Sequence, residues 1–311
     1  MESNLKFLSN YGDVQIYYDV YQPNLNRKII VQIAHGMAEH KDRYQGLCEY
    51  LCEQGFTVVI ADHRGHGKSL LSQETYGDMG EQGFEAAVED MHKLVKLMKQ
   101  RFRDYKYVML GHSMGSLLAR RYMQVHGTEM QAVILCGTPS RTSGLFFARM
   151  LAALVGITKG EQHRSKFLDG LIFGGFNRSF PKRTKFDWLN SDDAGVDAYI
   201  ADEACGFMFS TRSYYDLFTG LQKVYQRYPR PLKNPKCPVL FLSGEKDPCG
   251  RFTKGVKDAM NHLKKQGYLH VEMILYPNAR HELFQEKNKK DVYEDIVRFL
   301  NLKFIRPDNK K

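Results

Sequence analysis

The stretch that decides the fold is YVMLGHSMG, residues 107–115. Its first four residues form an apolar run typical of a buried strand, and residues 117–125 that follow have the apolar spacing of a helix. Gly-x-Ser-x-Gly in this context is typical of a sharp strand-to-helix turn that exposes the serine hydroxyl. A side chain at Gly111 or Gly115 would clash where strand and helix approach closely. The stretch therefore predicts Ser113 as a nucleophile, against the plainer interpretation of a surface serine in an ordinary turn.

Short apolar runs and helical stretches alternate on both sides of this turn. Such alternation is typical of an α/β fold, in which a mostly parallel sheet is covered by helices on both faces. It fails for roughly a hundred residues after Cys136, so we expect a core of residues 1–138 and 236–311 with an inserted, mainly helical cap over 139–235. Further strands are predicted over 14–21, 28–34, 57–61, 131–136, 238–242 and 271–276, and further helices over 44–54, 84–102 and 292–304.

A serine nucleophile needs a histidine base and a carboxylate that orients the histidine. In this type of fold the acid and then the histidine follow the serine along the chain. Asp247 and His281 each follow a predicted strand, so both are expected at the sheet edge where ligands bind. Glu245 is the alternative acid, but its earlier position in the turn favours a solvent-facing side chain. The remaining histidines after Ser113 lie in helical stretches, before a strand or in the insertion (His126, His163, His262 and His270).

A His-Gly step follows the predicted strand 28–34. Such a step lets the backbone fold over the nucleophile and donate an N–H. We therefore predict that the backbone N–H groups of Met37 and Met114 form an oxyanion hole. His35, Gly36 and His112 are predicted to contact the substrate. The alternative is that this loop only caps the next helix.

Composition and cysteine usage indicate the compartment and the partners. The 311-residue chain has a net charge of +10 and six cysteines without a Cys-x-x-Cys pair. With no signal peptide and no stretch long enough to span a membrane, we expect reduced thiols and a cytoplasmic protein. The run DHRGHG, residues 62–67, suggests a metal site, but no further ligand cluster accompanies it, and a braced loop is the favoured interpretation. No metal, no cofactor and no nucleic-acid partner are expected.

Several segments together resemble the monoacylglycerol lipase and lysophospholipase branch of the α/β-hydrolases, which shares motifs with serine aminopeptidases. The resemblance implies a cofactor-free serine esterase that acts on carboxylic esters of lipid alcohols through an acyl-enzyme, with Ser113, Asp247 and His281 as its triad. Ser116 departs from the pattern, because many relatives carry glycine there. The matching segments are HGMAEH (35–40) with RY (43–44), DHRGHGKS (62–69), GHSMG (111–115), GEKDP (244–248) and ARHE (279–282).

The predicted cap bears on the substrate and on membrane contact. Residues 145–157, LFFARMLAALVGI, are apolar almost all round, which suits either a helix packed on the core or a lid that lines an acyl pocket. Residues 139–233 contain 14 lysines and arginines against 9 aspartates and glutamates. This excess favours peripheral contact of the cap with an anionic membrane surface, while a small-molecule lipid ester is the expected substrate.

Two other functions use the same fold. An aminopeptidase would need an acidic cap residue to bind the substrate amino group, and Asp202 and Glu203 are the candidates. A non-catalytic ligand-binding protein is the third hypothesis, and the retention of serine, acid and histidine argues against it. The sequence carries no signal for the oligomeric state.

Overall fold

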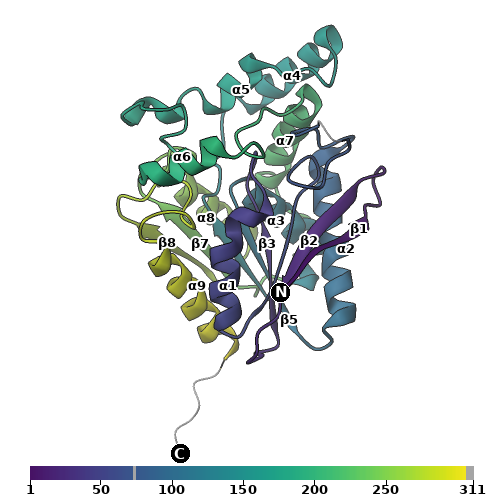
Figure 1. Ribbon diagram of the computed structural model, residues 1–311, viewed down its shortest axis with the longest axis vertical. Helices are drawn as coiled ribbons and strands as arrows, with labels where there is room; N and C mark the ends of the chain where they lie inside the picture. Colours follow the sequence, from purple (N-terminus) through teal and green to yellow (C-terminus); the bar gives the residue numbers. More distant parts are fainter. Residues whose placement is uncertain (73–74, 306–311) are drawn as a thin grey trace, which may run out of the picture.

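A twisted eight-stranded sheet runs through the centre of the protein (Figure 1). The computed structural model describes residues 1–72 and 75–305, so the last six residues of the predicted core segment lie outside the described residues. The strand order is β1-β2-β4-β3-β5-β6-β7-β8, with antiparallel pairing from β1 to β4 and parallel pairing from β4 to β8. The strands are β1 (Glu2–Leu8), β2 (Gln15–Tyr21), β3 (Ile29–Ala34), β4 (Thr57–Ala61), β5 (Lys106–His112), β6 (Ala132–Cys136), β7 (Val239–Gly244) and β8 (Val271–Tyr276).

Helices cover both faces of this sheet, and strand residues alternate between two apolar cores. In β5, Val108 and Leu110 join the core beneath α1 (Gln45–Glu53) and α9 (Lys289–Phe304). Tyr107 and Met109 join the opposite core, beneath α2 (Gly83–Arg101), α3 (Met114–His126) and α8 (Lys254–Gln266). Burial on both faces explains why the central strands have nearly continuous apolar sequences.

The predicted alternation of strands and helices is confirmed. Each predicted strand agrees with the structure within two residues at either end, and each predicted helix within three. Strand β1, in which only Phe7 is buried, was not predicted. An edge strand with one buried side chain has too weak an apolar pattern to predict.

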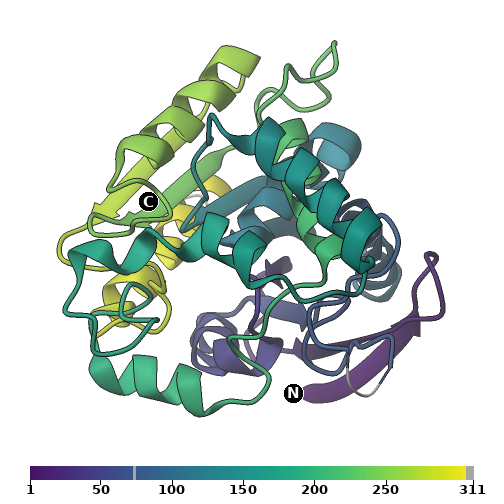
Figure 2. The ribbon, with the colours of Figure 1, turned by 90° about the horizontal axis from the view of Figure 1, so that it is seen from above.

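The chain between β6 and β7 forms helices that lie over the carboxyl edge of the sheet (Figures 1 and 2). Its last helix packs on the core helices α2 and α3, and on the first helix of the insertion. The spacing of Tyr214, Leu217, Phe218 and Leu221 is the amphipathic signal that could have predicted this last helix. The helices of the insertion are α4 (Leu145–Lys159), α5 (Lys166–Phe173), α6 (Asp193–Ala201) and α7 (Thr211–Val224), with the short 3-10 helix η3 (Phe176–Ser179) between α5 and α6. Outside the insertion, the described residues also form the 3-10 helices η1 (Lys41–Tyr44) and η2 (Gly127–Glu129).

Helix α4 has one packed side and one exposed side. Leu145, Ala148 and Leu151 pack against the apolar core, whereas Phe147 and Ile157 are 67% and 84% exposed. The apolar composition of the helix would allow burial on all sides, but the structure buries only one side. Among residues 1–72 and 75–305, no helix has both the length and the apolar character needed to cross a membrane.

Candidate active site

Ser113 lies between the last residue of β5 and the first residue of α3. Its φ of +50° and ψ of −116° form a strained conformation for a residue with a side chain. Several hydrogen bonds hold the turn: the Ser113 N–H donates to the Cys136 carbonyl at 2.9 Å, and the Ser113 carbonyl accepts from the Ser116 N–H at 2.9 Å and from the Ser116 hydroxyl at 2.6 Å. The unexpected serine at position 116 therefore stabilises the turn.

The two glycines of the turn allow the close approach that the sequence suggested. A Cβ atom on Gly111 would collide with the Gly115 carbonyl, and a Cβ on Gly115 would collide with the Ala34 carbonyl at the end of β3. Because neither position has a side chain, the start of α3 can pack closely against β5 and β3. The Ser113 side chain thus emerges at the carboxyl edge of the sheet, half-buried and facing the insertion.

His281 and Asp247 meet at the same edge. His281 follows β8 and Asp247 follows β7, and the His281 Nδ1 atom lies 3.0 Å from Asp247 Oδ2. The two side chains are 3% and 0% exposed. The Cys249 N–H donates to the other Asp247 oxygen at 2.8 Å. Glu245, the alternative acid, is exposed to solvent.

The surroundings of His281 favour its protonated form. Burial lowers the pKa of the imidazole, but the Asp247 carboxylate, its hydrogen bond, and the nearby Glu282 and Glu39 outweigh burial and raise the pKa above the ordinary 6.5. The pKa of His112 shifts in the opposite direction, although its ring centroid is only 4.9 Å from that of His281. Burial and the proximity of His281 lower the pKa of His112 to about 3, so it is neutral at physiological pH.

The loop after β3 approaches Ser113 closely. A Cβ on Gly36 would lie 3.3 Å from the Ser113 Cβ. The Gly36 N–H donates to Glu39 Oε1 at 2.5 Å. The N–H groups of Met37 and Met114 donate to no acceptor within the described residues, and both residues line the cavity that contains Ser113. Two free N–H groups are therefore available beside the serine.

The residues predicted to contact substrate occupy different positions. Gly36 and His112 line a cavity that contains Ser113. His35 is fully buried and lines neither cavity at the serine. Its Nδ1 lies 2.8 Å from the Gly36 carbonyl, and its Nε2 accepts a hydrogen bond from the His63 N–H at 2.9 Å. The predicted substrate contact of His35 is thus corrected: the imidazole lies beneath the loop and braces it.

A buried ion network, which the sequence analysis missed, joins this loop to the one that carries His281. Arg43 contacts Glu39 at 2.7 Å and Glu282 at 2.6 and 3.0 Å. The Glu39 carboxylate also accepts from the Tyr44 hydroxyl at 2.7 Å. Arg43, Tyr44 and both glutamates belong to the quoted motifs, but nothing in their spacing indicates that they meet.

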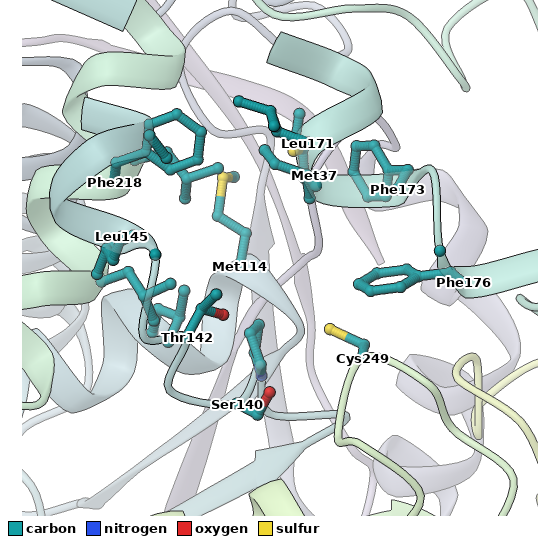
Figure 3. Close-up of a pocket in the computed structure, with 18 of the residues that line it drawn as sticks. Met37, Met114, Ser140, Thr142, Leu145, Leu171, Phe173, Phe176, Phe218 and Cys249 are labelled. Carbon is teal, nitrogen blue, oxygen red and sulfur yellow. The ribbon is translucent and has the colours of Figure 1, made fainter. Parts of the chain in front are cut away.

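Two cavities share Ser113. The larger cavity, about 670 Å³, is lined mainly by apolar side chains of the insertion, including Leu145, Leu171, Phe173 and Phe218 (Figure 3). The smaller cavity, about 550 Å³, is lined by Gly36, His281, Glu282 and several charged residues. Trp188, the single tryptophan of the chain, lines both cavities, and its ring centroid is 5.1 Å from that of His281.

The run 62–67 forms a braced loop, as expected. Asp62 accepts hydrogen bonds from the N–H groups of Lys41 and Lys68, both at 2.9 Å, and Arg64 pairs with Asp90 at 2.9 Å. In the described part of the chain, metal-ligating side chains gather in two other groups: Asp247, Cys249 and His281, and His40, Asp202 and Cys205. The first group belongs to the site around Ser113.

The sheet order and the site at its carboxyl edge define an α/β-hydrolase. The chain belongs to the Hydrolase_4 family, described as "serine aminopeptidase, S33", whose model matches residues 26–288. This membership makes it an enzyme, a serine hydrolase of the α/β-hydrolase type.

Several known proteins are similar over most of their length. A monoacylglycerol lipase of Mycolicibacterium smegmatis is 26% identical, covering 93% of this chain and 94% of the relative. Human monoglyceride lipase is 28% identical, covering 91% and 85%. The crystal structure of a thermostable carboxyl esterase from Bacillus coagulans in complex with glycerol superposes with a TM-score of 0.89 at 30% identity, covering 98% and 100%.

Proposed function

We propose that this enzyme hydrolyses carboxylic esters of lipid alcohols, of the monoacylglycerol or lysophospholipid type, through an acyl-enzyme on Ser113. The observation that carries the proposal is the buried His281–Asp247 pair beside a cavity that Ser113 also lines. The relatives support the ester class, because two are monoacylglycerol lipases and one is a carboxyl esterase.

The proposed reaction has two steps. Because Nδ1 of His281 faces Asp247, Nε2 is the nitrogen that takes the Ser113 proton as the serine oxygen attacks the ester carbonyl. The free N–H groups of Met37 and Met114 donate to the oxyanion, and His281 then gives its proton to the leaving alcohol. Water attacks the acyl-enzyme by the same route, which returns the serine hydroxyl and releases the carboxylic acid.

The two cavities suit the two parts of such a substrate. The larger one, between α4, α5, α7 and the core, has an apolar lining that matches an acyl chain. The smaller one has polar and charged residues near His281, which match a hydrated alcohol portion. In this proposal residues 139–235 act as a cap that completes both cavities.

The positions of Asp202 and Glu203 argue against the aminopeptidase alternative. The Asp202 carboxylate lies 2.8 Å from His40 Nε2, and Glu203 is exposed. Neither residue lines either cavity at Ser113. A substrate amino group bound beside the serine would therefore meet neither candidate.

The test is a substrate panel compared by kcat/KM. Monoacylglycerols of several chain lengths, lysophospholipids, p-nitrophenyl esters and aminoacyl amides should rank with the lipid esters first. Ala148→Phe narrows the larger cavity and should lower kcat/KM for long acyl chains more than for short ones. Ala198→Phe, at an exposed position of α6 that lines neither cavity, is the matched control. Faster turnover of aminoacyl amides than of esters would contradict the proposal.

We also propose that the cap contacts anionic membrane surfaces peripherally. Its excess of basic residues is accompanied by an exposed apolar face on α4 and α5, and such a face is typical of an interaction site. Leu154→Glu with Ile157→Glu should reduce sedimentation with anionic vesicles, while Leu302→Glu on α9 should not. Absence of salt-sensitive vesicle binding by the unaltered protein would contradict this part. The face comprises Phe146, Phe147, Met150, Leu154, Ile157, Phe167 and Leu171.

We infer a reducing, cytoplasmic location from the cysteines. All six are free, and Cys48, Cys136 and Cys237 are buried in the apolar cores. Burial raises the pKa of each of these thiols, which keeps them protonated and unreactive. Cell fractionation tests the inference, and recovery in an oxidising compartment would contradict it.

A further inference from the structure

A second group of metal-ligating side chains lies where the loop after β3 meets the insertion. His40 comes from the loop that carries Met37, whereas Asp202 and Cys205 follow α6. One potential ligand atom from each of the three residues lies within 4.8 Å of the other two. The proposed hydrolysis uses none of these residues, so their juxtaposition calls for an explanation of its own.

We propose that His40, Asp202 and Cys205 form a binding site for one divalent transition-metal ion, with Zn²⁺ as the best match. An imidazole nitrogen, a carboxylate oxygen and a thiolate sulfur are the ligands that Zn²⁺ takes in proteins. Mg²⁺ and Ca²⁺ prefer sets of oxygen ligands and match this group poorly. The His40 and Asp202 side chains are 13% and 35% exposed, so an ion can enter and a water can be the fourth ligand.

The ligand atoms are spaced so that only a small rearrangement is needed when the ion binds. His40 Nε2 lies 2.8 Å from Asp202 Oδ2. Zinc bonds to nitrogen and oxygen of about 2.0–2.1 Å set neighbouring tetrahedral ligands roughly 3.4 Å apart, so the ion would replace this hydrogen bond with little movement. The Ala204 N–H donates to the other Asp202 oxygen at 2.9 Å and holds the carboxylate. The Asp42 carboxylate faces His40 Nδ1 at 3.8 Å, where an outer carboxylate orients a metal-bound imidazole.

The local charge balance permits a cation. Two positive groups lie nearby, and carboxylates outside the proposed site pair with both: Arg43 with the buried Glu39 and Glu282, and Lys41 with Asp19 and Asp42. The Cys205 thiolate and the Asp202 carboxylate together offset the two charges of the ion. On binding, two protons pass to the buffer: the S–H proton of Cys205 and the Nε2 proton that His40 donates to Asp202. An S–Zn bond and an N–Zn bond form in their place, with no change of oxidation state.

An ion here would join two segments that already touch at Ala38. The Tyr199 hydroxyl and the Gly206 N–H both donate to the Ala38 carbonyl, at 2.8 and 2.9 Å. Ala38 follows Met37 directly, so the ion would fasten the insertion to the loop beside Ser113. Anything that binds only the folded state stabilises it, and we expect Zn²⁺ to raise the melting temperature.

The experiment uses Co²⁺ as a spectroscopic probe for Zn²⁺ on the full chain, freed of metal by chelation. We expect one equivalent of Co²⁺ to produce a sulfur-to-cobalt charge-transfer band that Zn²⁺ then removes. Cys205→Ser should abolish the band, and Asp202→Asn and His40→Gln should weaken Co²⁺ binding at least about tenfold. Far-ultraviolet circular dichroism of each metal-free variant shows whether it is folded, and the three substitutions alter different ligands, so a failure of one variant to fold leaves two tests.

Two matched cysteine variants make the assignment specific. Cys52→Ser, at the other partly exposed cysteine outside the active site, should keep the band. Cys249→Ser removes the thiol of the other group, the one with Asp247 and His281, and should also keep the band. A band that survives Cys205→Ser, a band lost only in Cys249→Ser, or no stoichiometric binding by the unaltered protein would overturn the proposal.

Discussion

Arg43 binds Glu282 through both of its terminal nitrogens, at 2.6 and 3.0 Å, although 239 residues separate the two along the chain. Glu282 follows His281 directly, and Arg43 also holds Glu39, whose carboxylate accepts the Gly36 N–H. One guanidinium therefore sets the distance between the loop with the free Met37 N–H and the loop with the histidine. In this account Arg43 is a positioning residue that does not contact substrate.

Arg43→Met should lower both stability and kcat. Removing one partner of a buried ion pair leaves uncompensated charges and typically costs about 3–5 kcal/mol of unfolding free energy. At a temperature where the variant is folded, kcat should fall while KM changes little, because Arg43 lines neither cavity at Ser113. Arg43→Lys should recover only part of kcat, since an ammonium cannot hold both carboxylates in a planar fork. Arg101→Ala, at an exposed pair with Glu2, is the control, and a similar loss there would contradict the account.

Gly36→Ala should impair the oxyanion loop specifically. The added Cβ would lie 2.5 Å from Glu39 Oε1 and 3.1 Å from His112 Cδ2, so the loop must shift. Displacing one oxyanion donor should lower kcat about 100- to 1,000-fold. Gly46→Ala in α1, where the new atom makes an ordinary 3.7 Å contact with Tyr293, should leave kcat unchanged. Equal kcat values for both variants would argue against a role for this loop.

The pH dependence of kcat/KM should follow His281. A general base works only when neutral, and the pKa of His281 lies above the ordinary 6.5. The value of kcat/KM should therefore rise with pH and level off above a midpoint higher than 6.5. Asp247→Asn removes the main group that raises this pKa, so the residual activity should have a lower midpoint. A midpoint below 6.5 in the unaltered protein would contradict the proposed His281–Asp247 coupling.

The sheet and the three residues of the site can be predicted because their signals lie in short stretches of sequence: an apolar run for each strand, and a reactive residue soon after it. Ser113 and Asp247 follow β5 and β7, which are buried almost throughout, and a strand with both faces covered has a continuous apolar sequence. His281 follows the partly exposed edge strand β8, whose sequence VEMILY is still mostly apolar. The parallel arrangement then brings the ends of separate strands to one edge.

The parts that were missed depend on contacts between distant segments. His35 was predicted to contact the substrate, yet its buried imidazole accepts a hydrogen bond from the His63 backbone N–H. The Arg43 network joins two loops whose charged residues have no distinctive spacing. The exposed and packed sides of α4 differ because α7 covers one of them, a contact that the near-uniform apolar composition of α4 cannot indicate.

The buried histidines make the folded state sensitive to acid. Burial lowers the pKa of His63 to about 3, of His66 to about 4 and of His112 to about 3, and also lowers that of His35. Below pH 6.5 the unfolded chain binds protons that the folded chain does not, so stability is fully present above this value and is lost as the pH falls toward 4. Each such histidine contributes about 1.4 kcal/mol per pH unit in that range.

Burial raises the pKa of Asp62 to about 6, and the pKa of His281 is also raised. His40 belongs with them, because burial is outweighed by hydrogen bonds to Asp42, Cys205 and Asp202 that raise its pKa to about 11. These three groups act in the opposite direction and offset only part of the effect of the buried histidines. Urea unfolding between about pH 7.5 and about pH 5 measures the balance. The unfolding free energy should fall steadily across this interval, with a smaller slope in His63→Asn. A flat or rising profile would contradict the buried, neutral state of these side chains.

The most direct test of the central claim is the rate of ester hydrolysis by purified Ser113→Ala. The substitution removes one oxygen at the half-buried tip of the turn and keeps both cavities, so the variant should fold as the unaltered protein does. If Ser113 is the nucleophile, kcat should fall on the order of 10⁶-fold. Retention of substantial esterase activity by this variant would contradict the account.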